Sequence, residues 1–213
     1  MKNILCFGDS NTWGYMPGTA GERYPFEKRW PGVMQRELGE GYQVLEAGLN
    51  GRMTVWDDPM SPGRCGKDHL PTILEMHTPL DLVIIALGVN DLKHHMNLMA
   101  IDLALGVGVL AQMVQDSGAG RLIGDARVSP DVLLLCPALP VQATHPFGHK
   151  LDGAVERSVG LVAAYEEIAK EQDCMCFDAN AVANSSAIDG VHLDDASLLR
   201  LGKALAGVIK SVE

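Results

Sequence analysis

The stretch I-L-C-F-G-D-S-N-T-W-G, residues 4–14, decides the fold. A short apolar run ends in Gly-Asp-Ser, which predicts a β-strand that delivers the hydroxyl of Ser10 to the carboxyl edge of a sheet. Open α/β sheets bind their ligands at that edge. Ser10 is therefore the first candidate for chemistry, although Gly-Asp-Ser is also ordinary turn composition and a serine there commonly caps a helix.

The rest of the chain alternates strand-like and helix-like segments. Four further apolar runs predict strands at residues 42–47, 81–87, 131–136 and 175–177. Helical periodicity predicts helices near residues 30–38, 70–77, 101–114, 150–172 and 194–211. Because the strands are apolar almost throughout, we expect an α/β fold with a parallel sheet that helices cover on both faces.

Length and charge limit the possible functions. The chain has 213 residues, 47% of them hydrophobic, which suffices for one domain over residues 1–213. Its net charge of −10 would repel phosphate backbones and anionic lipids, so neither nucleic acid nor a membrane is expected as a partner. No apolar run is long enough to span a bilayer and the start shows no signal-peptide pattern, so we expect a cytoplasmic protein.

Cysteines and histidines do not form a metal-binding pattern. The five cysteines include Cys174 and Cys176 as C-x-C, and are read as reduced thiols. His94 and His95 are adjacent, so on a helix they would point in different directions. His69 and His77 have no neighbouring set of ligands. We therefore expect no metal.

Polar residues gather where the predicted strands end. They lie at 8–10, 48–52, 88–91 and 189–192, each after a strand and the last just before the final helix. In a parallel sheet the carboxyl ends of the strands face one crevice, so these four clusters should converge there. Taken singly, each has an ordinary interpretation as a turn, a cap or a surface loop.

The four clusters together supply the parts of a serine acyl-transfer site. A serine hydroxyl needs a base, which is usually a histidine oriented by a carboxylate. Asp189 and His192 lie close enough on one loop for that pairing, leaving the other imidazole nitrogen for Ser10. Backbone N–H groups of Ser10 and Gly51 and the side-chain amide of Asn90 can serve as oxyanion donors.

The same four clusters resemble the sequence blocks of the SGNH hydrolases, also called GDSL-type esterases. The blocks are F-G-D-S-N-T at 7–12, G-L-N-G-R at 48–52, G-V-N-D at 88–91 and D-G-V-H at 189–192, in the family order. The longer runs I-L-C-F-G-D-S-N-T-W-G, L-D-L-V-I-I-A-L-G-V-N-D-L-K and D-G-V-H-L are similar to the bacterial arylesterase and acyltransferase (perhydrolase) branch.

The resemblance implies both architecture and activity. It implies a flavodoxin-like three-layer α/β/α sandwich with a central five-stranded parallel sheet. It further implies a Ser10/His192/Asp189 triad, an oxyanion hole from Ser10, Gly51 and Asn90, and no cofactor. The expected activity is hydrolysis of short-chain or aryl esters through an acyl-enzyme, sometimes with acyl transfer to alcohols or hydrogen peroxide.

Residues beside the four blocks are expected to shape the substrate pocket. These are Asn11, Trp13, Tyr15, Val89, Lys93 and Val191. Asn11 replaces the apolar residue that usually follows the serine in the family, so it bears on the acyl preference. Trp13 and Tyr15 could equally be core or interface aromatics. Asp9 and Asp91 are read as turn or network residues.

Residues 54–68 form a loop that is long for a strand-to-helix connection. Relatives of this branch are homo-oligomers, so we expect the loop to pack on a neighbouring subunit near the active-site mouth. Two other functions stay open. One is a carbohydrate O-acetylesterase with the same triad, and the other is a non-catalytic small-molecule binding protein that keeps the fold.

Overall fold

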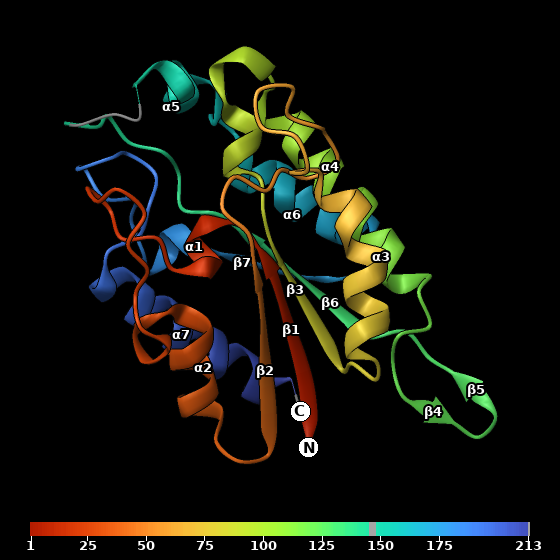
Figure 1. Cartoon of the computed structure of the whole chain (residues 1–213). Helices are drawn as coiled ribbons and strands as arrows, with labels where there is room; N and C mark the ends of the chain where they lie inside the picture. The colour runs from red at the N-terminus through yellow and green to blue at the C-terminus, as the bar shows by residue number, and fades with distance from the viewer. Residues whose placement is uncertain (145–147, 213) are drawn as a thin grey trace.

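A computed structural model describes residues 1–144 and 148–212 of the chain. Five parallel strands form its main sheet, in the spatial order β2-β1-β3-β6-β7 (Figure 1). These strands are β1 (Lys2–Gly8), β2 (Tyr42–Gly48), β3 (Leu82–Ala86), β6 (Asp131–Cys136) and β7 (Met175–Asp178). The predicted five-stranded parallel sheet is confirmed, and its strand order is the flavodoxin-like one.

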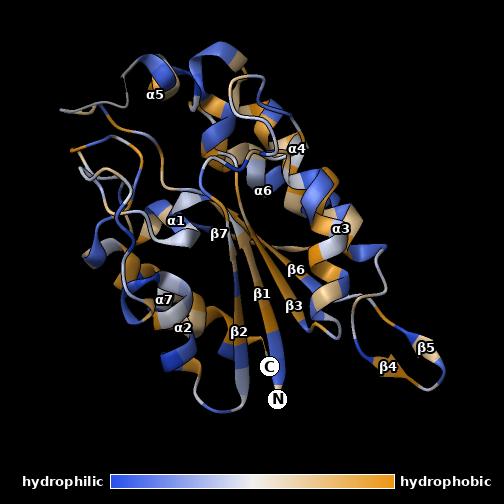
Figure 2. Cartoon of the chain, in the orientation of Figure 1, coloured by the Kyte–Doolittle hydropathy of each residue, from blue (hydrophilic) through white to orange (hydrophobic). Residues whose placement is uncertain are grey.

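Helices cover both faces of this sheet, because alternate side chains of each strand point to opposite faces. In β1, Ile4 and Cys6 pack in the core layer under α2 (Trp30–Leu38) and α7 (Asp195–Ser211). Leu5 and Phe7 pack in the opposite layer, under α3 (Gly66–His77), α4 (Ala100–Gln115) and α6 (Leu161–Glu171). Figure 2 shows the strands as the apolar centre of this arrangement. The predicted three-layer α/β/α sandwich is therefore confirmed.

The single helix predicted over residues 150–172 is wrong. The chain instead forms η4 (Gly148–Leu151), α5 (Ala154–Arg157) and α6. Gly153 and Gly160 interrupt the helix with φ of +74° and +86°, in the left-handed region that a right-handed helix cannot include. The apolar periodicity runs across both glycines, which is why the pattern alone suggested one helix.

A small hairpin lies between α4 and β6. It consists of β4 (Leu122–Ile123) and β5 (Ala126–Arg127), paired antiparallel, with Gly124 at φ +62° in the turn. Figure 1 shows it projecting away from the sheet. Two-residue strands carry too little alternation to be predicted from the sequence.

Short helical turns lie where the strands of the main sheet end. They are α1 (Ser10–Trp13), η2 (Val89–Leu92), η3 (His94–Met96) and η5 (Ala179–Ala181), and η1 (Phe26–Lys28) precedes α2. Residues 145–147, which include His145, lie outside the described residues. Among the residues that are described, no helix is long and apolar enough to cross a bilayer.

Candidate active site

Ser10 stands at the end of β1, as the first residue of α1. Asp9 caps this helix, since its carboxylate accepts the N–H of Asn11 at 2.9 Å. The N–H groups of a first helical turn have no acceptor within the helix. The N–H of Ser10 is therefore available to a ligand beside its own hydroxyl.

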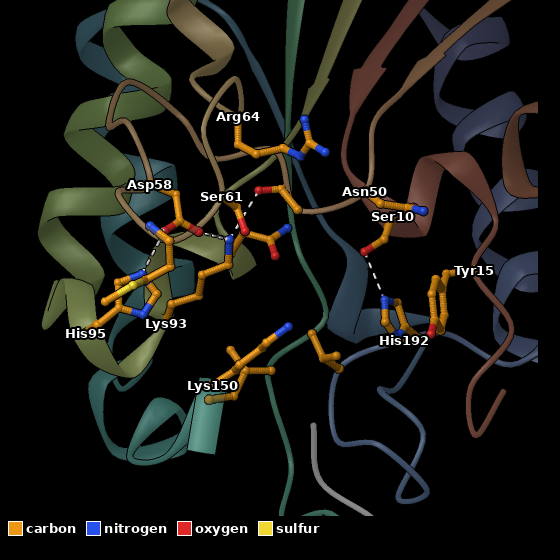
Figure 3. A pocket seen from close by; sticks show the side chains of 15 residues that line it. Ser10, Tyr15, Asn50, Asp58, Ser61, Arg64, Lys93, His95, Lys150 and His192 are labelled. Carbon is orange, nitrogen blue, oxygen red and sulfur yellow. Dashed lines mark hydrogen bonds and ion pairs between the residues drawn. The ribbon is translucent and has the colours of Figure 1, made fainter. Parts of the chain in front are cut away.

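Ser10, His192 and Asp189 form a continuous chain of hydrogen bonds. His192 Nε2 lies 2.9 Å from Ser10 Oγ, and His192 Nδ1 lies 2.9 Å from Asp189 Oδ2 (Figure 3 shows the first of these). Ser10 and His192 are 182 positions apart in sequence, so only the folded sheet brings them together. The geometry is the one that a serine nucleophile and its histidine base require.

The Asp189 carboxylate is held ionised by its surroundings. Burial alone would raise its pKa, but hydrogen bonds from the imidazole and backbone N–H of His192 and from the N–H of Val191 outweigh burial and lower it. An ionised carboxylate accepts the Nδ1 proton and so leaves Nε2 of His192 free to accept a proton from the serine.

Tyr15 covers one face of the His192 ring. The two ring centroids are 4.2 Å apart and the planes differ by 17°, which is a stacked arrangement. The hydroxyl of Tyr15 donates to the carbonyl of Thr19 at 3.0 Å. The imidazole is therefore oriented both by the carboxylate and by an aromatic face that is itself anchored.

Asn11 joins α1 to the loop that carries the histidine. Its side-chain oxygen accepts the N–H of Leu193 at 2.9 Å, and its amide donates to the carbonyl of Val191 at 3.3 Å. These two residues flank His192 in sequence. Asn11 does not line the cavity described below, so the structure places it as a link between the serine and histidine segments.

Asn90 and Gly51 face Ser10 across the sheet edge. Asn90 lies in η2, and one hydrogen of its side-chain amide points to Asp9 Oδ2 at 3.4 Å. Gly51 has φ +79°, a conformation that glycine adopts without strain. Ser10, Gly51, Asn90 and His192 all line one cavity, so the predicted oxyanion donors and the base are brought together.

That cavity has a volume of about 490 Å³. Figure 3 shows Ser10 and His192 on one side of it and Asp58, Lys93 and His95 on the other. Tyr15 and Val191, both expected near the substrate, also line it, and Lys93 is the third such residue. Cavities of this size bury ligands of drug-like dimensions.

The wall opposite Ser10 is built around a buried carboxylate. Asp58 is 1% exposed, and it accepts from Lys93 Nζ at 2.6 Å and pairs with His95 Nε2 at 2.8 Å. Burial acts to raise the pKa of Asp58, but the hydrogen bonds from Lys93, the Met60 N–H and His95 lower it to about 2. Asp58 therefore fixes residues 54–68 to the segment that follows Asn90.

Three of the residues expected to contact substrate, Asn11, Trp13 and Val89, are absent from the cavity wall. Trp13 stacks under the guanidinium of Arg23, which lies 4.8 Å from the ring centroid. Val89 is 1% exposed and belongs to the buried core. A substrate-binding role for Trp13, Val89 and also Asn11 stays an untested prediction that this geometry does not support.

Several cavity residues were not singled out from the sequence. They are Asn50, Asp58, Met60, Ser61, Arg64, His95, Lys150 and Leu151. Four of them belong to residues 54–68, and the length of that loop was a signal that it takes part in function. Lys150 has no sequence signal, because an isolated basic residue at the start of a predicted helix is usually a solvated surface group.

Buried polar side chains form hydrogen bonds that connect the strand ends behind the site. Arg52 is 4% exposed and donates to the carbonyls of Gly8 and Ala47, at the ends of β1 and β2. Asp91 accepts the N–H of Thr54 at 3.1 Å and its hydroxyl at 2.5 Å. Burial raises the pKa of Asp91 to about 7 and that of Asp9 to about 6. Both aspartates act as network residues in this geometry.

Among the described residues, no three His, Cys, Asp or Glu side chains form a group that could hold a metal ion. All five cysteines are free thiols. Burial raises the pKa of each of them. They behave as small apolar residues.

Fold and site together define a class of protein. A serine at the carboxyl edge of an open α/β sheet, hydrogen-bonded to a histidine that is bonded to a carboxylate, is the arrangement of serine hydrolases. Residues 6–198 match the model of the GDSL-like Lipase/Acylhydrolase family. The chain belongs to this family, and its predicted class, a carboxylic ester hydrolase, is confirmed.

Solved structures agree with this assignment over the whole chain. The native aryl esterase of M. smegmatis is 38% identical with a TM-score of 0.94, and 100% of each chain is covered. Est24, a carbohydrate acetylesterase from Sinorhizobium meliloti, is 36% identical with a TM-score of 0.94, again over 100% of each chain. Comparison with curated proteins gave no match.

Proposed function

We propose that Ser10 is the nucleophile of an esterase that works through an acyl-enzyme, with His192 as general base and Asp189 as its orienting carboxylate. The observation that carries this proposal is the chain of two 2.9 Å hydrogen bonds that ends on Ser10 Oγ inside a cavity. The proposal treats residues 1–213 as one catalytic domain, since one sheet positions every group involved.

The reaction proceeds in two displacements. Ser10 Oγ attacks the ester carbonyl while its proton passes to His192 Nε2, which then returns it to the leaving alkoxide. The carbonyl oxygen becomes an oxyanion that the N–H groups of Ser10 and Gly51 and the amide of Asn90 stabilise. A second molecule, activated by His192, then attacks the acyl-enzyme and releases Ser10.

Short-chain and aryl esters are the proposed substrates. The apolar part of the cavity wall includes Tyr15, Val191 and Leu151, which suit an aryl or short acyl group. The aryl esterase of M. smegmatis is similar to this chain over its full length. Water is the proposed acceptor in hydrolysis, with alcohols and hydrogen peroxide as further acceptors. Est24 supports a second candidate, deacetylation of carbohydrates, through the same catalytic groups.

Residues 54–68 support the proposal of a homo-oligomer. Asp58, Met60, Ser61 and Arg64 of this loop line the cavity, while Trp56 is 39% and Met60 73% exposed. Large apolar groups beside an active-site mouth favour burial against another surface. Light scattering coupled to size-exclusion chromatography tests this, and a monomer at micromolar protein would contradict it.

Five free thiols fit the proposed cytoplasmic location.

The decisive experiment compares the protein with its Ser10→Ala variant. The variant should lose hydrolysis of p-nitrophenyl acetate almost entirely and should no longer react with a fluorophosphonate probe. Near-normal turnover by the variant would contradict the assignment of Ser10 as the nucleophile. Failure of the unmodified protein to label at Ser10 would instead favour a non-catalytic binding protein.

Acyl preference and acceptor preference can be measured together. An acyl-chain series from acetyl to octanoyl esters, assayed with water, an alcohol and hydrogen peroxide in competition, separates hydrolysis from acyl transfer. Release of acetate from acetylated sugars but not from aryl esters would favour the carbohydrate O-acetylesterase.

A further inference from the structure

The cavity carries more positive charge than its catalytic chemistry uses. Arg64, Lys93 and Lys150 line it, and among the described lining residues Asp58 is the one carboxylate. Lys93 is neutralised by Asp58 through the 2.6 Å ion pair. Two cationic side chains are therefore left over, in a chain whose net charge is −10.

Arg64 and Lys150 have no acidic partner among the described residues. Arg64 makes one hydrogen bond, from Nη1 to the adjacent carbonyl of Gly63 at 2.9 Å. Within the described ranges, no carboxylate oxygen lies within ion-pair distance of either side chain. A guanidinium with four remaining donors is poised to bind an external acceptor.

Both groups line the cavity that holds Ser10. A Cβ built on Gly51 would lie 3.7 Å from Arg64 Nε and 3.8 Å from Lys93 Nζ, so Arg64 stands beside the expected oxyanion hole. In Figure 3 the ammonium of Lys150 points into the space between Ser10 and the Asp58 group, and Arg64 lies at the opposite border of that space. A ligand bound at Ser10 would lie between them.

The positive charges of Arg64 and Lys150 favour a negatively charged ligand in the cavity. At physiological ionic strength, charges more than about 8 Å apart are largely screened, so the acidic surface elsewhere contributes little inside the cavity. Arg64 and Lys150 are the cations of the cavity wall that have no acidic partner among the described residues. A guanidinium is planar and offers paired donors that match the two oxygens of a carboxylate.

We propose that the cavity takes esters that also carry a carboxylate, and that Arg64 and Lys150 bind this carboxylate while Ser10 attacks the ester. The inference rests on the proposed esterase chemistry at Ser10. It narrows the substrate class from neutral short-chain and aryl esters to anionic ones.

The test uses two pairs of esters of nearly equal size, in each of which one member carries a carboxylate and the other a neutral carboxamide. On the alcohol side, 4-acetoxybenzoate is compared with 4-acetoxybenzamide. On the acyl side, monophenyl succinate is compared with phenyl succinamate. At about 20 mM ionic strength, the carboxylate member of at least one pair should have ~10-fold higher kcat/KM, and this ratio should fall several-fold at about 300 mM.

Variants assign the effect to the two side chains. In the double variant Arg64→Gln/Lys150→Gln the preference for the carboxylate should fall at least ~5-fold, while Lys203→Gln, which removes an exposed charge on α7, should leave it unchanged. Thermal melting checks that each variant is folded. A ratio of one or less in both pairs overturns the inference, and so does a ratio that the double variant keeps.

Measuring the binding of the four compounds separates a failure of the carboxylate subsite from a failure of the proposed esterase function. If the protein hydrolyses neither member of a pair, the esterase proposal fails. Calorimetry of Ser10→Ala with the same four compounds then still decides, since tighter binding of a carboxylate would support the cationic subsite and equal binding in both pairs would overturn it.

Discussion

Replacing Asp58 by asparagine should destabilise the protein by about 2 kcal/mol at neutral pH. Asp58 is 1% exposed and Lys93 8%, so solvent screens their 2.6 Å ion pair poorly. The fall of the Asp58 pKa from 3.8 to about 2 corresponds to about 2.4 kcal/mol, at ~1.4 kcal/mol per pKa unit. Loss of one partner of a buried pair costs ~3 to 5 kcal/mol, which sets the upper limit.

The pH dependence of this effect has a defined sign. The pKa of Asp58 is lower in the folded protein, so its stabilisation is fully present above the ordinary value of 3.8 and is lost as the pH falls toward 2. The difference in stability between the protein and Asp58→Asn should therefore be constant from neutral pH down to about pH 5 and shrink below pH 4.

A double-mutant cycle isolates the pair. Urea unfolding of the protein, Asp58→Asn, Lys93→Met and the double variant should give a coupling free energy above about 1.5 kcal/mol at pH 7. The same cycle on Lys28 and Asp195, 3.2 Å apart with side chains 54% and 56% exposed, should give less than ~1 kcal/mol. A coupling at Asp58 no larger than this control would refute the reasoning.

Four further substitutions test the catalytic groups and the packing around them. Asn90→Ala should lower kcat by about 10² to 10³ with an unchanged melting temperature, since it removes one oxyanion donor. Asp189→Asn should lower kcat by ~10⁴ at pH 7, because an amide no longer holds the catalytic imidazole in the required tautomer; turnover within tenfold of normal would contradict this role. Gly88→Ala should be folded poorly, since its Cβ would lie 2.4 Å from the Tyr165 hydroxyl at φ +123°, whereas Gly39→Ala, with φ +84° and no atom within 4 Å, should cost only the backbone strain in urea unfolding.

The sheet was predictable because its strands are short and largely apolar runs, and the first three lead into a glycine. β1 ends at Gly8 and β3 is followed by Leu87 and Gly88, and both ends were visible in the sequence. The break of the 150–172 segment was not, because Gly153 and Gly160 sit in an uninterrupted helical pattern. Whether a glycine bends to positive φ depends on tertiary packing.

The grouping of Ser10, His192 and Asp189 was predictable because parallel strands bring their carboxyl ends to one edge. Tyr15, Lys93 and Val191 were also expected beside it, but the rest of the cavity wall was not. Asp58 and Arg64 reach the cavity through an irregular loop, whose path follows from particular contacts such as the pairing of Asp58 with Lys93 and His95. The role of Asn11 was not predictable from the sequence either. Its position after the serine suggested that it selects the acyl group, whereas its side chain forms hydrogen bonds with both neighbours of His192.

The distance of 182 positions between Ser10 and His192 has a consequence for synthesis of the chain. Ser10, the proposed nucleophile, precedes four of the five strands of the sheet in the chain, while His192, its proposed base, follows β7, the last strand of the sheet. A nascent chain therefore exposes a serine that cannot yet attack esters or bind covalent inhibitors. Reactivity with a fluorophosphonate should switch on only once the sheet is complete, so acylation of Ser10 can serve as a timed marker of the final folding step.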